Sequence, residues 1–219
     1  MNKIVVWGFR WAPPFAQGLV RDLRVRWALE EAGRAYDVEL IDFDERHSEA
    51  YRRRQPFGMV PAFEADGRGL FESAAIVHRI AEESAVLMPA EGPDRADVLG
   101  WMFAAVNTVE PPIQNLLEMD LLHAGESWVA LRRPAVVESV RARLDALADR
   151  LDGRDHLVGR FSAADILMTT VLRFARHTDL VEGHPVLDAY VQRCEARPAF
   201  HKALDAQLGD YARHAPVAA

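Results

Sequence analysis

Two dipeptides carry the groups from which a small-ligand site can be built. Val60-Pro61 begins a β-prone run, and Glu72-Ser73 follows about ten residues later at the head of an apolar helical pattern. Proline has no backbone N–H and survives in sheets only at strand starts, edges or bulges. The residue before it is pushed into an extended conformation, and in a tight bend the X-Pro bond can be cis. An extended peptide can therefore pair with the backbone of Val60 as one more strand.

Glu72-Ser73 supplies complementary chemistry at the start of the predicted helix. Free N–H groups and the helix dipole favour a carboxylate there, and the Ser73 hydroxyl can donate a further hydrogen bond. Taken singly, Val60-Pro61 can be a simple strand start and Glu72-Ser73 a simple helix cap. Taken together, they predict a site for a small, acidic, peptide-like ligand.

Hydrophobic periodicity predicts the elements that position these residues. In chain order we expect a strand at 3–7, a helix at 19–32 ended by Gly33, a strand at 35–43, a short helix at 48–54, two strands joined at Asp66-Gly67, and a helix from Ser73. The Asp-Gly pair is typical of a hairpin turn, because both residues tolerate positive φ. The first 84 residues therefore read as a βαβ-α-ββα domain.

The rest of the chain reads as helical. Residues 85–94 lose periodicity and contain two prolines and a glycine, which predicts a linker before an all-helical domain at 95–219. Pro111-Pro112 is expected to bend or interrupt the first helix of that domain. A later helix places apolar residues on one stripe, namely Val137, Val140, Leu144, Leu147 and Leu151. Ser162 and Asp165 have the spacing of a capping box, Pro185 suits a first helical turn, and Pro198 begins a short last helix.

Composition limits the classes of partner and of chemistry. The 219 residues have a net charge of -7, which disfavours nucleic acid and anionic membranes as partners. The single cysteine, Cys194, excludes an intrachain disulfide and is most simply a packing residue, so we expect a reducing, cytoplasmic setting. The N-terminus does not resemble a signal peptide, and no apolar run reaches the length of a membrane span. The eight histidines show no metal-binding spacing, so no metal is expected.

The segment "QPFGMVPAFEADGRGLFESAAIVHRI" resembles the glutathione-binding half of the cytosolic glutathione transferases. The similarity extends over nearly the full chain through "LRVRWALEEAG", "FSAADILM" and "RCEARPAFHKAL". It implies an α/β plus all-α fold, in which a thioredoxin-like domain at 1–84 precedes the helical domain. It also implies a homodimer.

The resemblance implies a role for each residue of the predicted site. The backbone of Val60 would pair with the cysteinyl part of glutathione, in a loop shaped by a cis Pro61 and including Met59. Glu72 would take the γ-glutamyl ammonium group, and Ser73 the γ-glutamyl carboxylate. One of the arginines at 52–54 is a candidate for the glycyl carboxylate. By the same resemblance, Ser162 and Asp165 would be structural.

The sequence departs from the family at the group that activates the thiol. These enzymes generally use a hydroxyl or thiol near the end of the first strand, but residues 1–35 contain no Ser, Thr, Tyr or Cys. Lowering a thiol pKa by about two units requires roughly 2.7 kcal/mol. A helix N-terminus and one arginine can supply that energy. The candidate catalytic residues are Arg21, Gln17 and Arg10.

A hydrophobic electrophile would bind in a cleft between the domains. Candidate pocket residues are Trp11, Phe103 and Asn107, with the apolar Trp101, Met102 and Val106 as further possibilities. Asn107 or Thr108 could also face the thiol. The predicted function is glutathione transfer to an electrophile in detoxification. Alternatives are a glutathione-dependent disulfide reductase, isomerase or dehalogenase, and a binding scaffold without turnover.

Overall fold

The computed structural model describes residues 3–216, which form two compact units. The first unit contains residues 3–87 together with 197–216, and the second contains residues 88–196. The boundary between 87 and 88 lies within the expected linker. The return of residues 197–216 to the first unit differs from the expected division at 95–219, and it follows from a buried ionic cluster described below.

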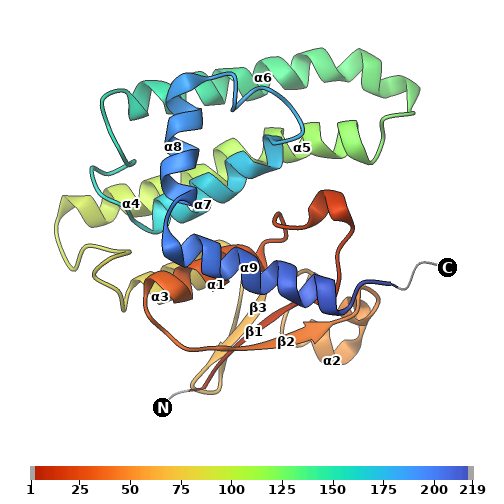
Figure 1. Ribbon diagram of the computed structural model, residues 1–219, viewed down its shortest axis with the longest axis vertical. Helices are drawn as coiled ribbons and strands as arrows, with labels where there is room; N and C mark the ends of the chain where they lie inside the picture. The colour runs from red at the N-terminus through yellow and green to blue at the C-terminus, as the bar shows by residue number, and fades with distance from the viewer. Residues whose placement is uncertain (1–2, 217–219) are drawn as a thin grey trace. The chain divides into compact units, whose positions relative to one another are not determined.

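The first unit is built on a four-stranded sheet in the order β2-β1-β3-β4 (Figure 1). β1 pairs parallel with β2, whereas β3 pairs antiparallel with β1 and with β4. Its elements are β1 (Ile4–Phe9), η1 (Pro14–Ala16), α1 (Asp22–Glu31), β2 (Asp37–Ile41), η2 (Glu45–His47), α2 (Glu49–Arg52), β3 (Ala62–Ala65), β4 (Arg68–Phe71), α3 (Ser73–Ala81) and α9 (Pro198–Arg213). The βαβ-α-ββα order is confirmed, as is the turn, where Asp66 and Gly67 have φ of 55° and 73°.

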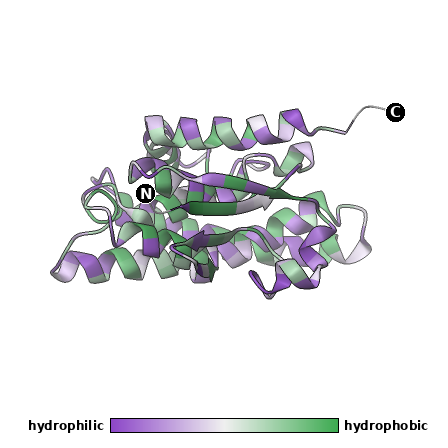
Figure 2. Cartoon of the chain, turned by 90° about the horizontal axis from the view of Figure 1, so that it is seen from below, coloured by the Kyte–Doolittle hydropathy of each residue, from purple (hydrophilic) through white to green (hydrophobic). Residues whose placement is uncertain are grey.

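Helix α1 is the centre of the first unit. All its residues from Asp22 to Leu29 are buried, because it packs against β1, α3 and α9. Trp27 is fully buried and meets Phe200 of α9 edge to face, with ring centroids 4.9 Å apart. β1, the strand that α1 contacts, is largely buried, whereas the sheet as a whole contains both hydrophobic and hydrophilic residues (Figure 2). α1 therefore connects the sheet with the last helix of the chain.

The ionic cluster on α1 holds α9 in the first unit. Arg26 pairs with Asp22 at 2.8 Å and with Asp210 of α9 at 2.7 Å, and the Gln207 amide donates to Asp22 at 2.7 Å. Burial raises the pKa of Asp22, although Arg26 opposes this. A buried charge is tolerated only when it is paired, so these partners must stay together. α9 runs for 16 residues, and the expectation of a short last helix was wrong.

The second unit is all helical. It contains α4 (Pro93–Ala104), the π-helical η3 (Ala105–Val109), α5 (Glu110–Leu121), α6 (Ser127–Leu151), α7 (Ala163–Leu172), η4 (Arg173–Ala175) and α8 (Pro185–Glu195). Pro111 and Pro112 lie in the first turn of α5 and cannot donate to the carbonyl groups of Asn107 and Thr108. The expected interruption is therefore the π-helical turn that contains those two carbonyls.

Two details of the second unit correct the sequence analysis. α6 begins at Ser127, ten residues before Val137, the first residue of the expected stripe, and contains Pro134. Its buried stripe includes Val136 in place of Val137, with Val140 and the following leucines as expected.

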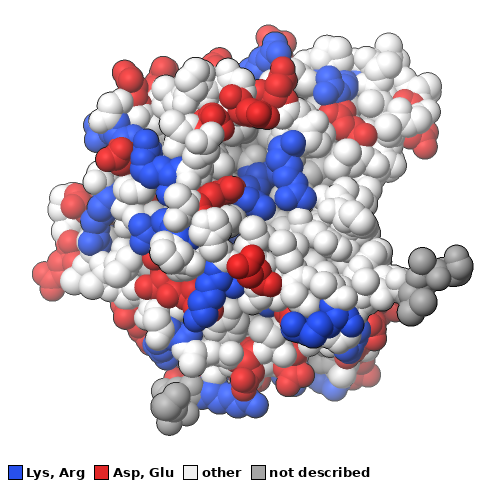
Figure 3. Space-filling view, viewed as in Figure 1, with Lys and Arg blue, Asp and Glu red and all other residues white. Residues whose placement is uncertain are grey.

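No helix in the described part of the chain is long and apolar enough to cross a membrane. The face shown in Figure 3 intersperses acidic and basic side chains.

Candidate functional site

The peptide bond between Val60 and Pro61 is cis, which confirms the prediction. Val60 is 6% exposed and packs in a small apolar cluster with Ile41, Tyr51 and Ala62. The register of β3 with β1 begins at Ala62. The backbone of Val60 therefore lies just outside the paired part of the sheet, where an added peptide strand can bond to it.

Tyr51 fixes the loop that precedes the cis proline. Its hydroxyl donates a hydrogen bond of 2.7 Å to the carbonyl oxygen of Met59. Ser48 caps α2 by accepting a bond from the Tyr51 N–H at 3.1 Å, which orients that helix. Burial raises the pKa of Tyr51, so the hydroxyl remains a donor across the physiological range. Tyr51 could not be identified from the sequence, because only the fold brings α2 beside the proline loop.

The start of α3 has the geometry of an anion site. Glu72 precedes the helix with φ of 70° and makes no side-chain capping bond, and the first turn contains no acidic residue. The Ile76 N–H donates to the Glu72 carbonyl at 2.9 Å, which leaves the earlier N–H groups of the helix directed outward. Glu72 therefore does not act as an ordinary side-chain cap of α3.

Ser73 is the first residue of α3 and only 6% exposed. Its hydroxyl oxygen accepts a hydrogen bond of 3.2 Å from Nη1 of Arg24, which is 2% exposed on α1. Arg24 was not among the predicted site residues, although an arginine in the middle of an apolar helix is an unusual residue to bury. The Arg24 guanidinium and the buried Ser73 hydroxyl thus lie side by side at the N-terminus of α3.

The start of α1 belongs to the same region. Val20, two residues before this helix, packs against the cluster that contains Val60. Arg24, one turn further on, reaches Ser73. The Val60 loop, the start of α3 and the start of α1 thus come together at one end of the first unit.

The three catalytic candidates differ in what they contact. Arg10 donates to a carboxylate oxygen of Asp42 at 2.9 Å and to the carbonyl of Leu40 at 3.0 Å. Its guanidinium is therefore bound at the C-terminal end of β2. Gln17 donates to the carbonyl of Ala12 at 2.9 Å and so organises the loop before α1. Arg21 occupies the N-cap position of α1, is half-buried, and makes no side-chain capping bond. Of the three, Arg21 combines a charge with a helix N-terminus.

The three arginines at 52–54, at the C-terminal end of α2, are exposed. Arg53 pairs with Glu49 at 2.7 Å, and Arg54 lies over the ring of Trp7 at 4.7 Å. A cavity of about 360 Å³ adjoins this surface. It is lined by Trp7, Ile41, Glu45, Ala50, Tyr51, Arg53 and Arg54. A role for one of the arginines with the glycyl carboxylate remains a prediction.

The co-substrate candidates occupy different environments. Trp11 is half-buried in the first unit. In the second unit, Phe103 on α4 is 65% exposed, and Asn107 is exposed one turn later in the π-helical segment. Met102 is 3% exposed and belongs to the core, whereas Trp101 lies under the guanidinium of Arg150 at 5.5 Å. Phe103, Asn107 and Thr108 are thus the exposed candidates of the second unit.

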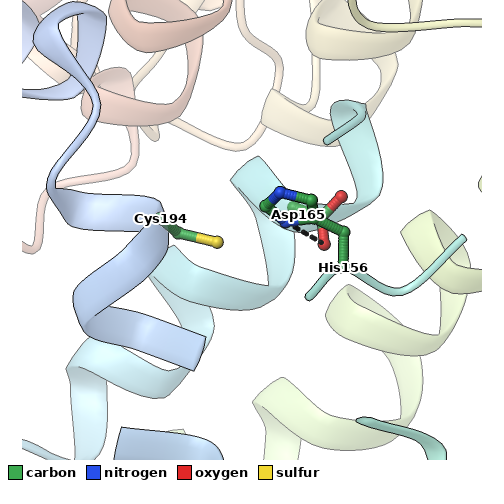
Figure 4. A group of neighbouring side chains, drawn as sticks. All are labelled: His156, Asp165 and Cys194. Atoms are coloured by element: carbon green, nitrogen blue, oxygen red, sulfur yellow. Dashed lines mark ion pairs between the residues drawn. The ribbon is translucent and has the colours of Figure 1, made fainter. Parts of the chain in front are cut away.

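One group of potential metal ligands escaped the sequence analysis, because its members come from three segments. His156, Asp165 and Cys194 offer ligand atoms within 4.8 Å of one another (Figure 4). Asp165, however, already accepts bonds from the N–H groups of Leu157 and Ser162 and from the hydroxyls of Ser162 and Tyr190. Burial raises the pKa of the Cys194 thiol to about 12, so the thiol is protonated. The chemistry of this group is that of a capping box for α7, as the spacing of Ser162 and Asp165 predicts.

Two protein-family models match this chain, one in its N-terminal half and one in its C-terminal half. Residues 17–82 match the family model of the glutathione S-transferase N-terminal domain, and residues 132–198 match that of the C-terminal domain. A maleylacetoacetate isomerase from Rhizobium meliloti is 31% identical over 191 residues, which cover 82% of this chain and 89% of the relative. A protein of Oryza sativa subsp. japonica, named probable glutathione S-transferase GSTF1, is 28% identical over 193 residues, covering 82% and 88%.

A solved structure shows the same fold. The crystal structure of a glutathione transferase from Pseudomonas putida, with one glutathione disulfide bound per subunit, has a TM-score of 0.80 and 21% identity to this chain. The match covers 92% of this chain and 90% of that one. This likeness confirms the expected fold class.

Proposed function

This chain belongs to the glutathione S-transferase family, and from that premise we propose that it binds glutathione and directs the thiolate at an electrophile. The observation that supports the proposal best is the start of α3. Its N–H groups have no side-chain cap, Ser73 is buried beside Arg24, and the loop at Val60 lies at the same end of the unit. Such a site suits a peptide that carries a carboxylate.

Each part of glutathione has a proposed partner. The cysteinyl backbone pairs with the N–H and C=O of Val60, next to Met59 and Pro61. The γ-glutamyl carboxylate accepts bonds from the Ser73 hydroxyl and from the N–H groups of α3. Glu72 carries the opposite charge to the γ-glutamyl ammonium group and lies exposed at the same helix end. Glutathione is a co-substrate here, and the proposed chemistry requires no metal.

The thiolate is stabilised in this proposal by Arg21 and the N-terminus of α1. Arg21 is the N-cap of that helix, so its charge and the helix dipole act at the same place. Gln17 and Arg10 are proposed as secondary contributors that hold the loop around the sulfur. The sulfur then forms a bond to the electrophilic carbon, and the leaving group departs with its bonding electrons. In an addition reaction, a proton is taken up by the product instead.

The electrophile is proposed to contact Trp11, Phe103 and Asn107. Phe103 offers a large apolar surface that is 65% exposed, which suits a hydrophobic compound. We further propose that the chain works as a homodimer in the cytoplasm, in detoxification. Sedimentation velocity on the purified chain, for which we expect twice the monomer mass of 24.6 kDa, tests the oligomeric state.

A second candidate function is a glutathione-dependent isomerisation. The relative from Rhizobium meliloti, at 31% identity, is named a maleylacetoacetate isomerase. In such a reaction the thiolate adds to a conjugated cis double bond, the resulting single bond rotates, and elimination returns both glutathione and the trans product. The same thiolate serves both functions, so the electrophile distinguishes them.

The proposal is tested first by binding and then by turnover. Isothermal titration calorimetry with glutathione up to millimolar concentration is expected to show one site per chain. Activity is then measured with an aryl halide for transfer and with maleylacetoacetate for isomerisation. Binding without either activity would support the scaffold alternative. Absence of binding at millimolar glutathione would overturn the proposed function.

A further inference from the structure

Arg24 is a buried charged residue that the proposed chemistry does not yet use. It lies in the middle of α1 and is 2% exposed. Its Nη1 reaches across to α3 and donates to the Ser73 hydroxyl oxygen at 3.2 Å. Burying a guanidinium is costly unless its donors are satisfied, so this contact restricts the position of α3 relative to α1.

The direction of this hydrogen bond determines what the Ser73 hydroxyl can do. A guanidinium carries donors only, so the serine oxygen must accept. A hydroxyl has one proton to donate, and Arg24 cannot receive it. The proton is therefore available to an acceptor on another side of Ser73, where the N–H groups at the start of α3 also point.

Arg24 also acts on an anion through its charge. The guanidinium lies behind Ser73 in a buried setting, where charges are screened less than on the surface. A carboxylate bonded to the Ser73 hydroxyl thus receives a hydrogen bond that the adjacent cation polarises. The first turn of α3 contains no acidic side chain to compete for this field.

We infer that Arg24 is a positioning residue for the γ-glutamyl carboxylate, which it recognises through the Ser73 hydroxyl. The inference rests on the proposed function, because it specifies how that site selects its ligand. It assigns to α1 a part in ligand selectivity at α3, in addition to its part in the fold. Arg24 does not touch the reacting sulfur and is not a catalytic residue.

The test compares two ligands in wild type and in Arg24→Met. One ligand is glutathione, and the other is its analogue without the γ-glutamyl α-carboxylate, γ-aminobutyryl-cysteinyl-glycine. We expect Arg24→Met to weaken glutathione binding about tenfold, as the loss of a charge-assisted contact does, and to leave binding of the analogue within about twofold. Calorimetry gives both dissociation constants. Arg79→Met is the matched control, because Arg79 is an exposed residue of α3 that pairs with Glu83 at 2.6 Å.

A double-mutant cycle shows whether Arg24 acts through Ser73. In the Ser73→Ala background we expect Arg24→Met to change glutathione affinity by less than about threefold, because the mediating hydroxyl is absent. Arg24→Lys keeps the charge and is expected to restore part of the discrimination between the ligands. If the methionine variant does not fold, Arg24→Gln, which also removes the charge, replaces it in the comparison.

The outcomes separate this inference from the proposed function. If wild type binds glutathione and the Arg24 variants lose affinity for both ligands equally, Arg24 is merely structural and the inference is overturned. The inference is also overturned if Arg24→Met discriminates between glutathione and the analogue as strongly as wild type does. If wild type binds neither ligand, the proposed function itself fails.

Discussion

The hydroxyl of Tyr51 donates a 2.7 Å hydrogen bond to the carbonyl oxygen of Met59, the residue before Val60. Tyr51 is 4% exposed and shares an apolar cluster with Val60. The loop that we propose to pair with glutathione is thus held in place by one side chain of α2. Such support matters, because a backbone edge binds a peptide well only when it is held in place before the peptide arrives.

Replacing Tyr51 by Phe should weaken glutathione binding while leaving the ring in place. The carbonyl of Met59 loses its donor, which costs about 1 kcal/mol, and the loop gains freedom that binding must then remove. We expect a three- to tenfold higher dissociation constant by calorimetry. An affinity equal to that of wild type would show that the loop does not depend on this hydrogen bond.

Glu72→Ala and Ser73→Ala should each weaken glutathione binding by roughly 1 to 3 kcal/mol. Each substitution removes a proposed polar partner of the γ-glutamyl group at the start of α3. Melting temperatures are measured in parallel, and a variant that binds weakly but melts as wild type separates ligand recognition from folding. Wild-type affinity in both variants would mean that their roles are misassigned.

Several features of the fold, one of them in the candidate site, could be predicted from the sequence, because their signals are local. The turn at Asp66-Gly67, the cis bond at Pro61 and the capping box at Ser162 depend on residues a few positions apart. Arg24 and Tyr51 were missed because their partners, Ser73 and Met59, are supplied by other elements. Only a fold can bring such residues together.

The place of α9 could not be predicted for the same reason. Its attachment depends on Asp210 and Gln207 meeting Arg26 and Asp22, which lie more than 180 residues earlier. In the sequence these are ordinary polar positions on amphipathic helices, where a solvated face is the usual interpretation. In the folded chain all four side chains are buried and contact one another in the ionic cluster.

Gly8→Ala tests how tightly that cluster is packed. A Cβ at Gly8 would lie 2.9 Å from Oδ2 of Asp22, whose position is fixed by Arg26 and Gln207. We expect a loss of about 1 to 3 kcal/mol in the free energy of unfolding, measured with urea. Gly100→Ala is the control, because a Cβ there meets nothing within 4 Å and alanine favours helix α4 by about 1 kcal/mol. Equal stabilities of the two variants would contradict this picture.

Arg21→Ala should raise the pKa of glutathione bound to the protein. The thiolate absorbs in the ultraviolet, so a titration of the complex gives the pKa directly. Loss of one nearby charge at a helix N-terminus is expected to raise the pKa by about one unit, equivalent to about 1.4 kcal/mol. Arg79→Ala is a control, because Arg79 is an exposed arginine that pairs with Glu83 and has no proposed contact with the ligand. An unchanged pKa in Arg21→Ala would remove Arg21 as the thiolate's partner.

Cys194 provides a prediction about pH and about mechanism. Burial raises its pKa from 9.0 to about 12 in the folded chain, so the unfolded chain releases this proton first as the pH rises. The contribution of the protonated thiol to stability is complete below pH 9 and is lost between pH 9 and 12, at about 1.4 kcal/mol per pH unit. Urea unfolding of wild type should therefore weaken with pH more steeply than that of Cys194→Ala, in which the tyrosines titrate as before.

The same burial removes Cys194 from glutathione chemistry. A fully buried, protonated thiol does not attack a disulfide, because the thiolate is the nucleophile. We expect the native thiol to resist a thiol reagent at pH 8 and to react only on unfolding. Cys194→Ala should then keep the glutathione-dependent turnover of wild type. Loss of turnover in a variant that still folds and binds glutathione would instead support a disulfide mechanism through this cysteine.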